Sequence, residues 1–187
     1  MEVLMNATNF LLCVIAASGG SVNGRTLLQK RSFFVSELTG MDAGLQYDAH
    51  FYGPFSPTVE GATTQLKNLG FLQESSTGFG LVNGGFEVRR YDYALTEDGK
   101  RLMEPLVKTQ EYQRIKSAVD RVIQAGDPNY VELSLAAKAY FLLKKKGGGM
   151  QLSEFQKQAE QYNWSISPKS VEKALAFLRA VGLATTS

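Results

Sequence analysis

Ser56-Pro57-Thr58-Val59-Glu60, followed by Leu66-Lys67-Asn68-Leu69-Gly70-Phe71, is the stretch that most strongly indicates the fold. A serine N-cap, a proline at the first helical position and a closing glycine are typical of a short helix that turns into a strand. A similar stretch recurs later in the chain, as Ser167-Pro168, Val171-Glu172 and Leu178-Arg179-Ala180-Val181-Gly182-Leu183. From Val59 onward the two copies are offset by a constant 112 residues. The chain therefore contains an internal repeat.

Each copy is expected to be the third helix of a three-helix unit. Apolar periodicity predicts helices over Thr8–Ser18 and Arg25–Leu38 before the first copy. It predicts helices over Leu133–Lys146 and Ser153–Tyr162 before the second, the latter opened by a capping box at Ser153. Three short helices with this ending describe a helix-turn-helix module. Trp164 is expected to fill the core of the second module.

The first copy is followed by the signals of a β-hairpin. Phe71–Ser75 and Phe86–Leu95 read as strands, and Asn83-Gly84 between them is a tight-turn signal. Thr96 then caps a further helix. In the second copy a strand is expected from Gly182, with a truncated or absent hairpin. The predicted fold is mainly α with a small β-hairpin wing, arranged as tandem winged-helix or helix-turn-helix modules.

The glycine-rich and proline-containing breaks suggest three parts. Residues 1–104 are predicted to form a winged-helix-like domain and residues 105–126 a connecting helix, with an apolar stripe over Pro105–Ala125. Gly126-Asp127-Pro128-Asn129 is taken as the boundary before a second helix-turn-helix-like domain over residues 127–187.

Composition excludes several classes of protein. Apolar residues make up 44% and charged residues 20%, as in an ordinary globular protein. One cysteine and one histidine exclude a disulfide scaffold and a structural zinc site. The longest apolar run, Phe10–Ala17, is far shorter than the roughly 20 residues of a membrane span, and Glu2 is the only charge before Arg25, unlike a signal peptide. We expect a reduced, cytoplasmic protein without membrane or cofactor.

The formal charge of +2 hides an uneven distribution. Residues 1–104 hold eight Lys/Arg against eleven Asp/Glu, whereas residues 105–187 hold twelve against seven. A basic half is compatible with contact to nucleic acid or to an acidic protein, and also with an ordinary solvated surface.

A helix-turn-helix module places its third helix in the major groove of DNA. The residues expected to point outward there are Thr58, Gly61, Gln65 and Asn68, and Gln and Asn can pair bidentately with adenine. Cations around the helix are expected to hold phosphates. The predicted DNA-binding residues are therefore Arg25, Lys30, Thr58, Gln65, Asn68, Arg89, Arg90, Lys169 and Lys173. The expected partner is double-stranded DNA, and the expected function is non-enzymatic transcriptional regulation.

Two other functions remain open on the sequence. The Pro105–Ala125 stripe and the aromatic residues Tyr47, Phe51, Tyr52 and Phe55 are compatible with a protein-interaction adaptor or a homodimer, and equally with core packing. Catalysis is the second of these functions. Asp48 and His50 share one strand face, but no second histidine or acidic cluster completes a site, and Cys13 is expected to be a buried thiol. No catalytic or metal-ligating residue is predicted.

Four motifs occur in an order that resembles a known family. They are Gly24-Arg25-Thr26-Leu27-Leu28-Gln29-Lys30, His50-Phe51-Tyr52-Gly53-Pro54-Phe55-Ser56, Leu69-Gly70-Phe71-Leu72 and Tyr93-Ala94-Leu95-Thr96-Glu97-Asp98-Gly99. Together they resemble the YwgA-like uncharacterised prokaryotic proteins, and the first two are similar, more distantly, to the Panacea antitoxin domain. The resemblance covers roughly residues 5–105. It implies a winged-helix-like fold, and the antitoxin similarity implies protein binding or self-regulation at DNA.

Overall fold

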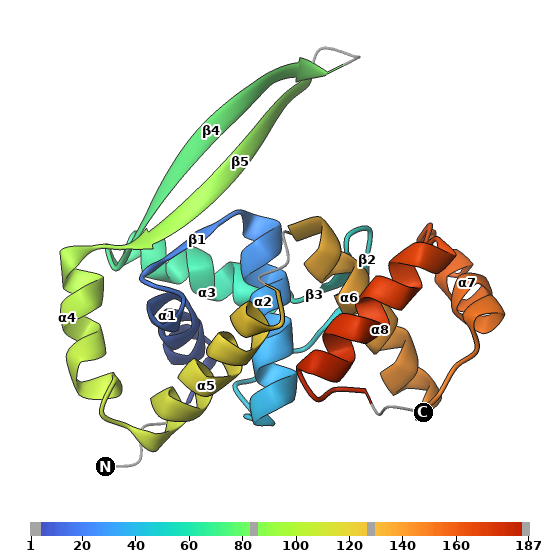
Figure 1. Ribbon diagram of the computed structural model, residues 1–187. Helices are drawn as coiled ribbons and strands as arrows, with labels where there is room; N and C mark the ends of the chain where they lie inside the picture. Colours follow the sequence, from blue (N-terminus) through green and yellow to red (C-terminus); the bar gives the residue numbers. More distant parts are fainter. Residues whose placement is uncertain (1–4, 83–85, 127–129, 185–187) are drawn as a thin grey trace.

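The computed structural model describes residues 5–82, 86–126 and 130–184, and it is mainly helical with a small amount of antiparallel sheet (Figure 1). This confirms the predicted mainly α class. The elements follow in the order α1 (Ala7–Ala17), β1 (Ser21–Asn23), α2 (Arg25–Thr39), β2 (Asp48–His50), β3 (Gly53–Phe55), α3 (Pro57–Asn68), β4 (Leu72–Val82), β5 (Phe86–Leu95), α4 (Glu97–Leu106), α5 (Gln110–Gln124), α6 (Tyr130–Lys146), α7 (Leu152–Glu160) and α8 (Pro168–Ala180).

The larger sheet has the strand order β1-β5-β4, with both pairs antiparallel. β1 pairs only with Asp92–Ala94 at the base of β5, so the rest of the β4–β5 hairpin is a two-stranded ribbon. Figure 1 shows this ribbon projecting from the helical body. β2 and β3 form a separate short hairpin between α2 and α3. In the sequence, α3 is thus preceded by the β2–β3 hairpin and followed by the β4–β5 hairpin.

The hairpin is longer than the sequence predicts. β5 has the predicted bounds, Phe86–Leu95, but β4 continues to Val82 instead of ending at Ser75. Serine, threonine and glycine in Ser75–Gly80 suggest a loop, yet backbone pairing with β5 holds this segment as a strand. The predicted Asn83-Gly84 turn lies outside the described residues.

Three local predictions are wrong. Pro105–Ala125 is not one helix, because α4 ends at Leu106 with Pro105 inside it, and Thr109 caps the separate α5 by accepting a hydrogen bond from the Tyr112 amide. The capping box at Ser153 does not form, since the N-cap of α7 is Gln151. No strand follows Gly182 within the described residues 182–184.

The buried apolar residues form two clusters. The first joins α1, α2, α3, α4 and α5 with the base of the sheet, and Leu28 and Val35 of α2 lie in it. The second joins α6, α7 and α8, and it also contains Phe33 and Phe34 of α2. Trp164 is buried in the second cluster as predicted, and its indole nitrogen donates to the His50 carbonyl oxygen at 2.7 Å. α2 therefore packs against both halves of the chain.

The division at residues 104 and 126 stays a prediction, and the position of α2 shows that the two halves share packing. Among the described residues, no helix combines the length and the apolarity that a membrane span requires.

Candidate nucleic-acid interface

The start of α3 is fixed as the sequence predicts. The Ser56 hydroxyl accepts a hydrogen bond from the Val59 amide at 3.3 Å, and Pro57 occupies the first turn. Val59, Ala62 and Leu66 face the core. After the helix, Gly70 adopts a left-handed φ of 76°, which lets the chain turn at once into β4. α3 therefore presents its opposite side to solvent next to the hairpin.

Two buried polar side chains of α2 hold the segment that leads into α3. The Gln29 amide donates to the Ser56 carbonyl oxygen at 2.9 Å and accepts from the Ser56 amide at 3.0 Å. The Lys30 ammonium donates to the Pro54 carbonyl oxygen at 2.6 Å. Sequence reasoning missed the role of Gln29, although a buried-face glutamine in an otherwise apolar stripe is a signal for such a bond. The first two motifs of the resemblance thus contact each other in the fold.

Lys30 is not a DNA contact. Its side chain is 2% exposed, between α2 and the β2–β3 hairpin, and so does not reach the surface. Burial, with the nearby charge of Lys138 on α6, lowers the pKa of Lys30 to about 7. The prediction that Lys30 holds a phosphate is therefore wrong, because this amine is used inside the fold.

Arg25 links three elements at the surface. It is exposed at the start of α2 and pairs with Glu60 of α3 at 3.8 Å. Its Nε donates to the Tyr93 hydroxyl of β5 at 3.4 Å, and its guanidinium lies 5.0 Å from the centre of the Tyr91 ring. The Tyr93 hydrogen bond, against the effect of burial, raises the pKa of Arg25. Arg25 thus braces α3 against the hairpin while its side chain remains accessible.

A second ion pair closes the angle between α3 and the hairpin. Lys67 of α3 pairs with Glu74 of β4 at 2.7 Å. Burial opposes ionisation of Glu74, but hydrogen bonds from Lys67 and Tyr93 and the charges of Lys67 and Arg25 lower its pKa overall. The recess that these groups line has a volume of about 30 Å³. That is room for a water molecule rather than for a substrate.

The predicted α3 residues lie on one side of the helix but differ in accessibility. Gln65 and Asn68 are exposed, whereas Thr58 is half-buried. The Gln65 side-chain oxygen also accepts a hydrogen bond from the Thr8 hydroxyl of α1 at 3.0 Å. Gly61 is exposed, and a side chain added there would meet nothing within 4 Å.

Thr64 is an exposed residue that the sequence analysis missed. At 100° per residue, Gly61, Thr64 and Asn68 fall at the centre of the arc opposite the buried residues of α3. A helical wheel that places Val59, Ala62 and Leu66 on the buried side would have identified Thr64 as exposed.

Arg89 and Arg90 are exposed on the projecting part of β5. They lie opposite Gly78 and Thr77 of β4 in the strand register. Arg89 donates to the Ser76 hydroxyl at 3.5 Å, and Arg90 pairs with Asp92 at 2.8 Å. We call the exposed residues of α3 together with Arg25, Arg89 and Arg90 the α3–hairpin face.

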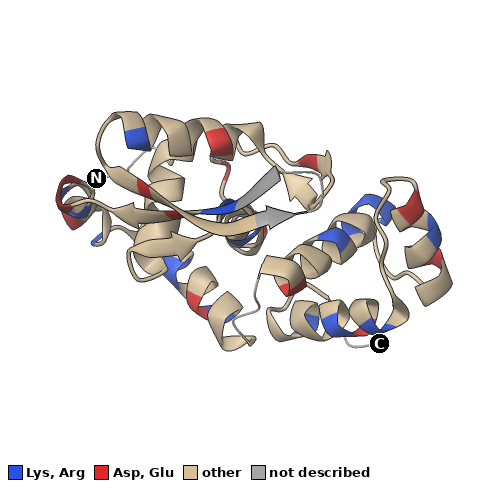
Figure 2. Ribbon diagram, turned by 90° about the horizontal axis from the view of Figure 1, so that it is seen from above, with Lys and Arg blue, Asp and Glu red and all other residues tan. Residues whose placement is uncertain are grey.

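Lys169 and Lys173 are exposed on α8, as predicted, but they belong to a different part of the molecule. Lys173 pairs with Glu132 of α6 at 3.3 Å. Figures 1 and 2 show α6 and α8 away from α3 and the base of the hairpin. The structure therefore does not bring these lysines onto the α3–hairpin face.

The α3–hairpin face carries charges of both signs. Arg25, Lys67 and Arg90 have the acidic partners Glu60, Glu74 and Asp92, respectively. Figure 2 shows acidic and basic residues interspersed over the hairpin and neighbouring helices. Because these three cations have acidic partners, electrostatic attraction to a polyanion at this face would be modest.

The residues considered for catalysis, Asp48, His50 and Cys13, do not come together within the described part of the chain. Asp48 and His50 are exposed at the two ends of β2, and the described residues contain no group of three or more His, Cys, Asp or Glu placed to hold a metal. Cys13 is buried, as predicted, and burial raises the pKa of its thiol to about 12. A thiol of that pKa is a poor nucleophile at neutral pH.

The fold and face define a mainly helical protein with a small antiparallel sheet, from which a two-stranded ribbon extends beside an exposed polar helix. The chain is 33% identical over 93 residues to Uncharacterized protein YwgA of Bacillus subtilis (strain 168). The match covers 50% of this chain and 52% of that protein, so the chain spans about half the length of the curated relative it matches. No protein-family model matches the chain. The match supports the resemblance to YwgA-like proteins.

Proposed function

We propose that the protein binds double-stranded DNA through the α3–hairpin face and acts as a non-enzymatic regulator of transcription. One observation carries the proposal: α1, β1, α2, α3, β4 and β5 occur in this order, with the β2–β3 hairpin inserted between α2 and α3, and β1 pairs with β5. This order and pairing are those expected of a winged helix. In this reading α3 is the recognition helix and the β4–β5 hairpin is the wing.

The exposed arc of α3 suits a groove-facing role. Thr64 and Asn68 offer hydrogen-bonding groups for base edges, and Gly61 allows the helix backbone to come close. Gln65 can contact a base edge through its amide nitrogen, or through its side-chain oxygen once the hydrogen bond from Thr8 breaks. Arg89 and Arg90 on the ribbon contact phosphates beside the groove.

The paired charges predict a modest electrostatic contribution to binding. Each phosphate contact releases condensed counterions, so the affinity falls with salt in proportion to the number of contacts. The logarithmic salt slope should therefore decrease by about 2 when Arg89 and Arg90 are both replaced by alanine.

Fluorescence anisotropy with a labelled, mixed-sequence duplex, titrated at salt concentrations from about 50 to 200 mM, tests the proposal. The matched control is the double variant Lys100→Ala and Arg101→Ala, which removes two adjacent exposed cations from α4. We expect Arg89→Ala with Arg90→Ala to weaken binding and flatten its salt dependence, and the control to change neither. Equal effects of the two double variants would contradict the role of the hairpin.

The second half supports a further part of the proposal, that α6, α7 and α8 form a second helix-turn-helix module. The Ser167 hydroxyl caps α8 by accepting from the Ser170 amide, as Ser56 does for α3. Lys169, in the first turn of α8, is exposed and is available for a second stretch of duplex.

A second candidate function, protein binding, is favoured by a different observation. Phe51 and Tyr52, at the turn between β2 and β3, are 66% and 55% exposed and pack edge to face at 5.0 Å. The other predicted feature, the apolar stripe of α5, no longer favours protein binding, because most of it is used in the core: Ile115, Ala118 and Val119 lie in the first cluster and Val122 in the second. The antitoxin similarity stays a prediction under this candidate.

Sedimentation velocity on the protein and on the Phe51→Ser, Tyr52→Ser double variant tests the simplest partner, a second copy of the chain. A dimer that the double variant abolishes would favour this candidate. If both proteins sediment as monomers, self-association through these rings is excluded.

A further inference from the structure

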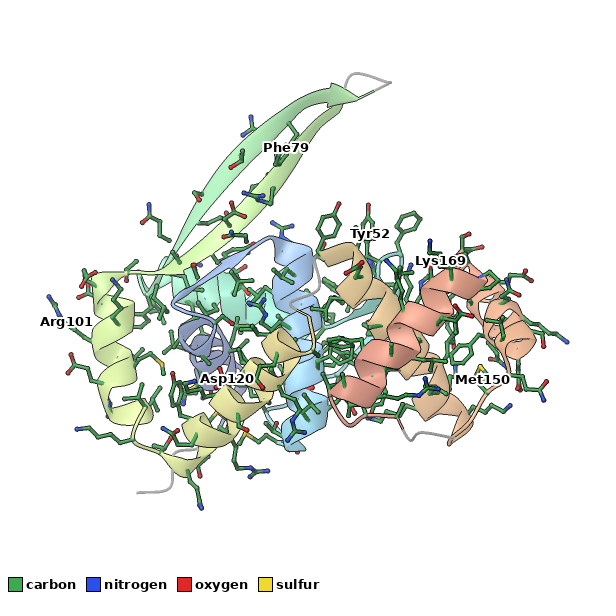
Figure 3. All side chains as sticks on the ribbon, in the orientation of Figure 1. Tyr52, Phe79, Arg101, Asp120, Met150 and Lys169 are labelled. Carbon is green, nitrogen blue, oxygen red and sulfur yellow. The ribbon has the colours of Figure 1, made fainter. Side chains whose placement is uncertain are left out.

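The hairpin carries an exposed aromatic side chain with no role in the core. Phe79 of β4 is 61% exposed, and Figure 3 places it on the projecting ribbon, beyond the helical body. It belongs to neither cluster of buried residues. A single exposed phenyl ring does not by itself mark a binding site, so the inference depends on the backbone and the charges around Phe79.

The backbone at Phe79 is shaped by a β-bulge. The register runs from Gly78 opposite Arg89 to Leu81 opposite Glu87, so Phe79 and Gly80 stand where β5 has one residue. Gly80 adopts a φ of 87°, which side chains rarely allow. Bulges re-aim a side chain relative to the regular ribbon and are frequent next to functional sites.

The surroundings of the ring suit a polyanion. Ser75–Gly80 contains no acidic residue, and its residues other than Phe79 are serine, threonine and glycine. Arg89 and Arg90 lie across the ribbon from this segment. Small hydroxyl and glycine residues allow a nucleic-acid backbone to come close, and the arginines complement its charge.

One arginine also supports the ring itself. The Arg90 guanidinium lies 5.6 Å from the centre of the Phe79 ring, and Asp92 anchors the same guanidinium by an ion pair at 2.8 Å. This leaves Phe79 backed on one side by a cation, an arrangement that favours stacking against a nucleobase.

We propose that Phe79 is an aromatic wedge that stacks into a base step of the bound duplex, with Arg90 behind it and both arginines close to the adjacent phosphates. The proposal rests on DNA binding by the α3–hairpin face and adds how the hairpin engages the bases. Apolar wedges of this kind partly unstack a step and kink the duplex. Pyrimidine–purine steps such as TA unstack most easily, so the wedge implies a preference for them.

The test compares two labelled duplexes of about 20 base pairs, or two helical turns, one with central TA steps and one with a central A-tract. An adenine of a TA step is replaced by 2-aminopurine, whose fluorescence rises when its stacking is lost. Phe79→Ala removes the ring, Phe79→Trp keeps an aromatic surface, and Tyr130→Ala is the control, since it removes another exposed aromatic ring from the start of α6.

We expect the wild-type protein to bind the TA duplex about tenfold more tightly than the A-tract duplex, with a rise in fluorescence. Phe79→Ala should lose both the preference and the rise, Phe79→Trp should retain them, and Tyr130→Ala should match the wild type. Binding without any preference, or a preference that Phe79→Ala retains, overturns the wedge but leaves DNA binding in place. Failure of the wild type to bind either duplex overturns both.

Discussion

Lys30 and Gln29 show how single buried residues of α2 position the candidate site. Both hold the backbone just before α3, and neither is exposed. Their motif could be recognised from the sequence, but the roles of its residues could not. A lysine in a helix gives the same sequence signal whether it binds a phosphate or a buried carbonyl oxygen. For Lys30, the packing of α6 over Gly53 encloses the side chain, so it binds a carbonyl oxygen.

Lys30 makes the stability of the protein depend on pH. Its folded-state pKa of about 7 lies below the ordinary value of 10.5, so between these values the unfolded chain binds a proton that the folded chain does not. Stability should therefore rise with pH, by about 1 kcal/mol per pH unit, and this rise should be absent from Lys30→Met. Urea unfolding at several pH values in this window measures it.

The exposed Lys108 supplies a control for that experiment, because Lys108→Met removes a lysine at the surface. This control should keep the pH dependence of the wild type. A Lys30→Met variant with the same pH dependence as the wild type would show that the amine is not desolvated.

At the scale of the element, α3 was predictable and the hairpin only partly so. The Ser-Pro start and the closing glycine of α3 are local signals, and the structure confirms them. The length of β4 depends on pairing with β5, which overrides the loop-like composition of Ser75–Gly80. Which α3 residues are accessible depends on α1, whose Thr8 engages Gln65.

Gly61 separates the two roles of α3, helix stability and groove contact. Gly61→Ala should stabilise the protein by about 0.5–1 kcal/mol, because alanine favours the helix and a side chain there meets nothing within 4 Å. Gly61→Gln should fold equally well but weaken duplex binding, since a long side chain keeps the helix from the groove floor. Thermal unfolding and anisotropy on the same samples measure both; undiminished binding by Gly61→Gln would argue against close approach of α3.

At the scale of the whole molecule, the repeat is real in sequence but the two halves are packed together. Phe34 of α2 lies 5.2 Å from Phe177 of α8, ring centre to ring centre, and Lys144 of α6 pairs with Glu37 of α2 at 2.7 Å. The predicted end of the first half, residue 104, lies within α4. Local sequence patterns contain no information on packing between distant segments, so the division into halves stays a prediction.

This shared packing predicts a single cooperative unfolding transition. Trp164, the one tryptophan in the sequence, reports on the second core cluster, while circular dichroism reports on all helices. The two signals should therefore have coincident denaturant midpoints. Phe34→Ala should lower the free energy of unfolding by about 3 kcal/mol, and the two midpoints should fall together. Separate midpoints would show that the halves unfold independently.

Hydrogen–deuterium exchange of the whole protein, with and without a mixed-sequence duplex, tests the central proposal most directly, because it locates the bound surface without assuming a target sequence. DNA binding through the α3–hairpin face predicts slower exchange in Pro57–Asn68 and in the β4–β5 hairpin, with α4 and α5 unchanged. Slower exchange confined to α4 and α5, or no change anywhere in the chain, would contradict it.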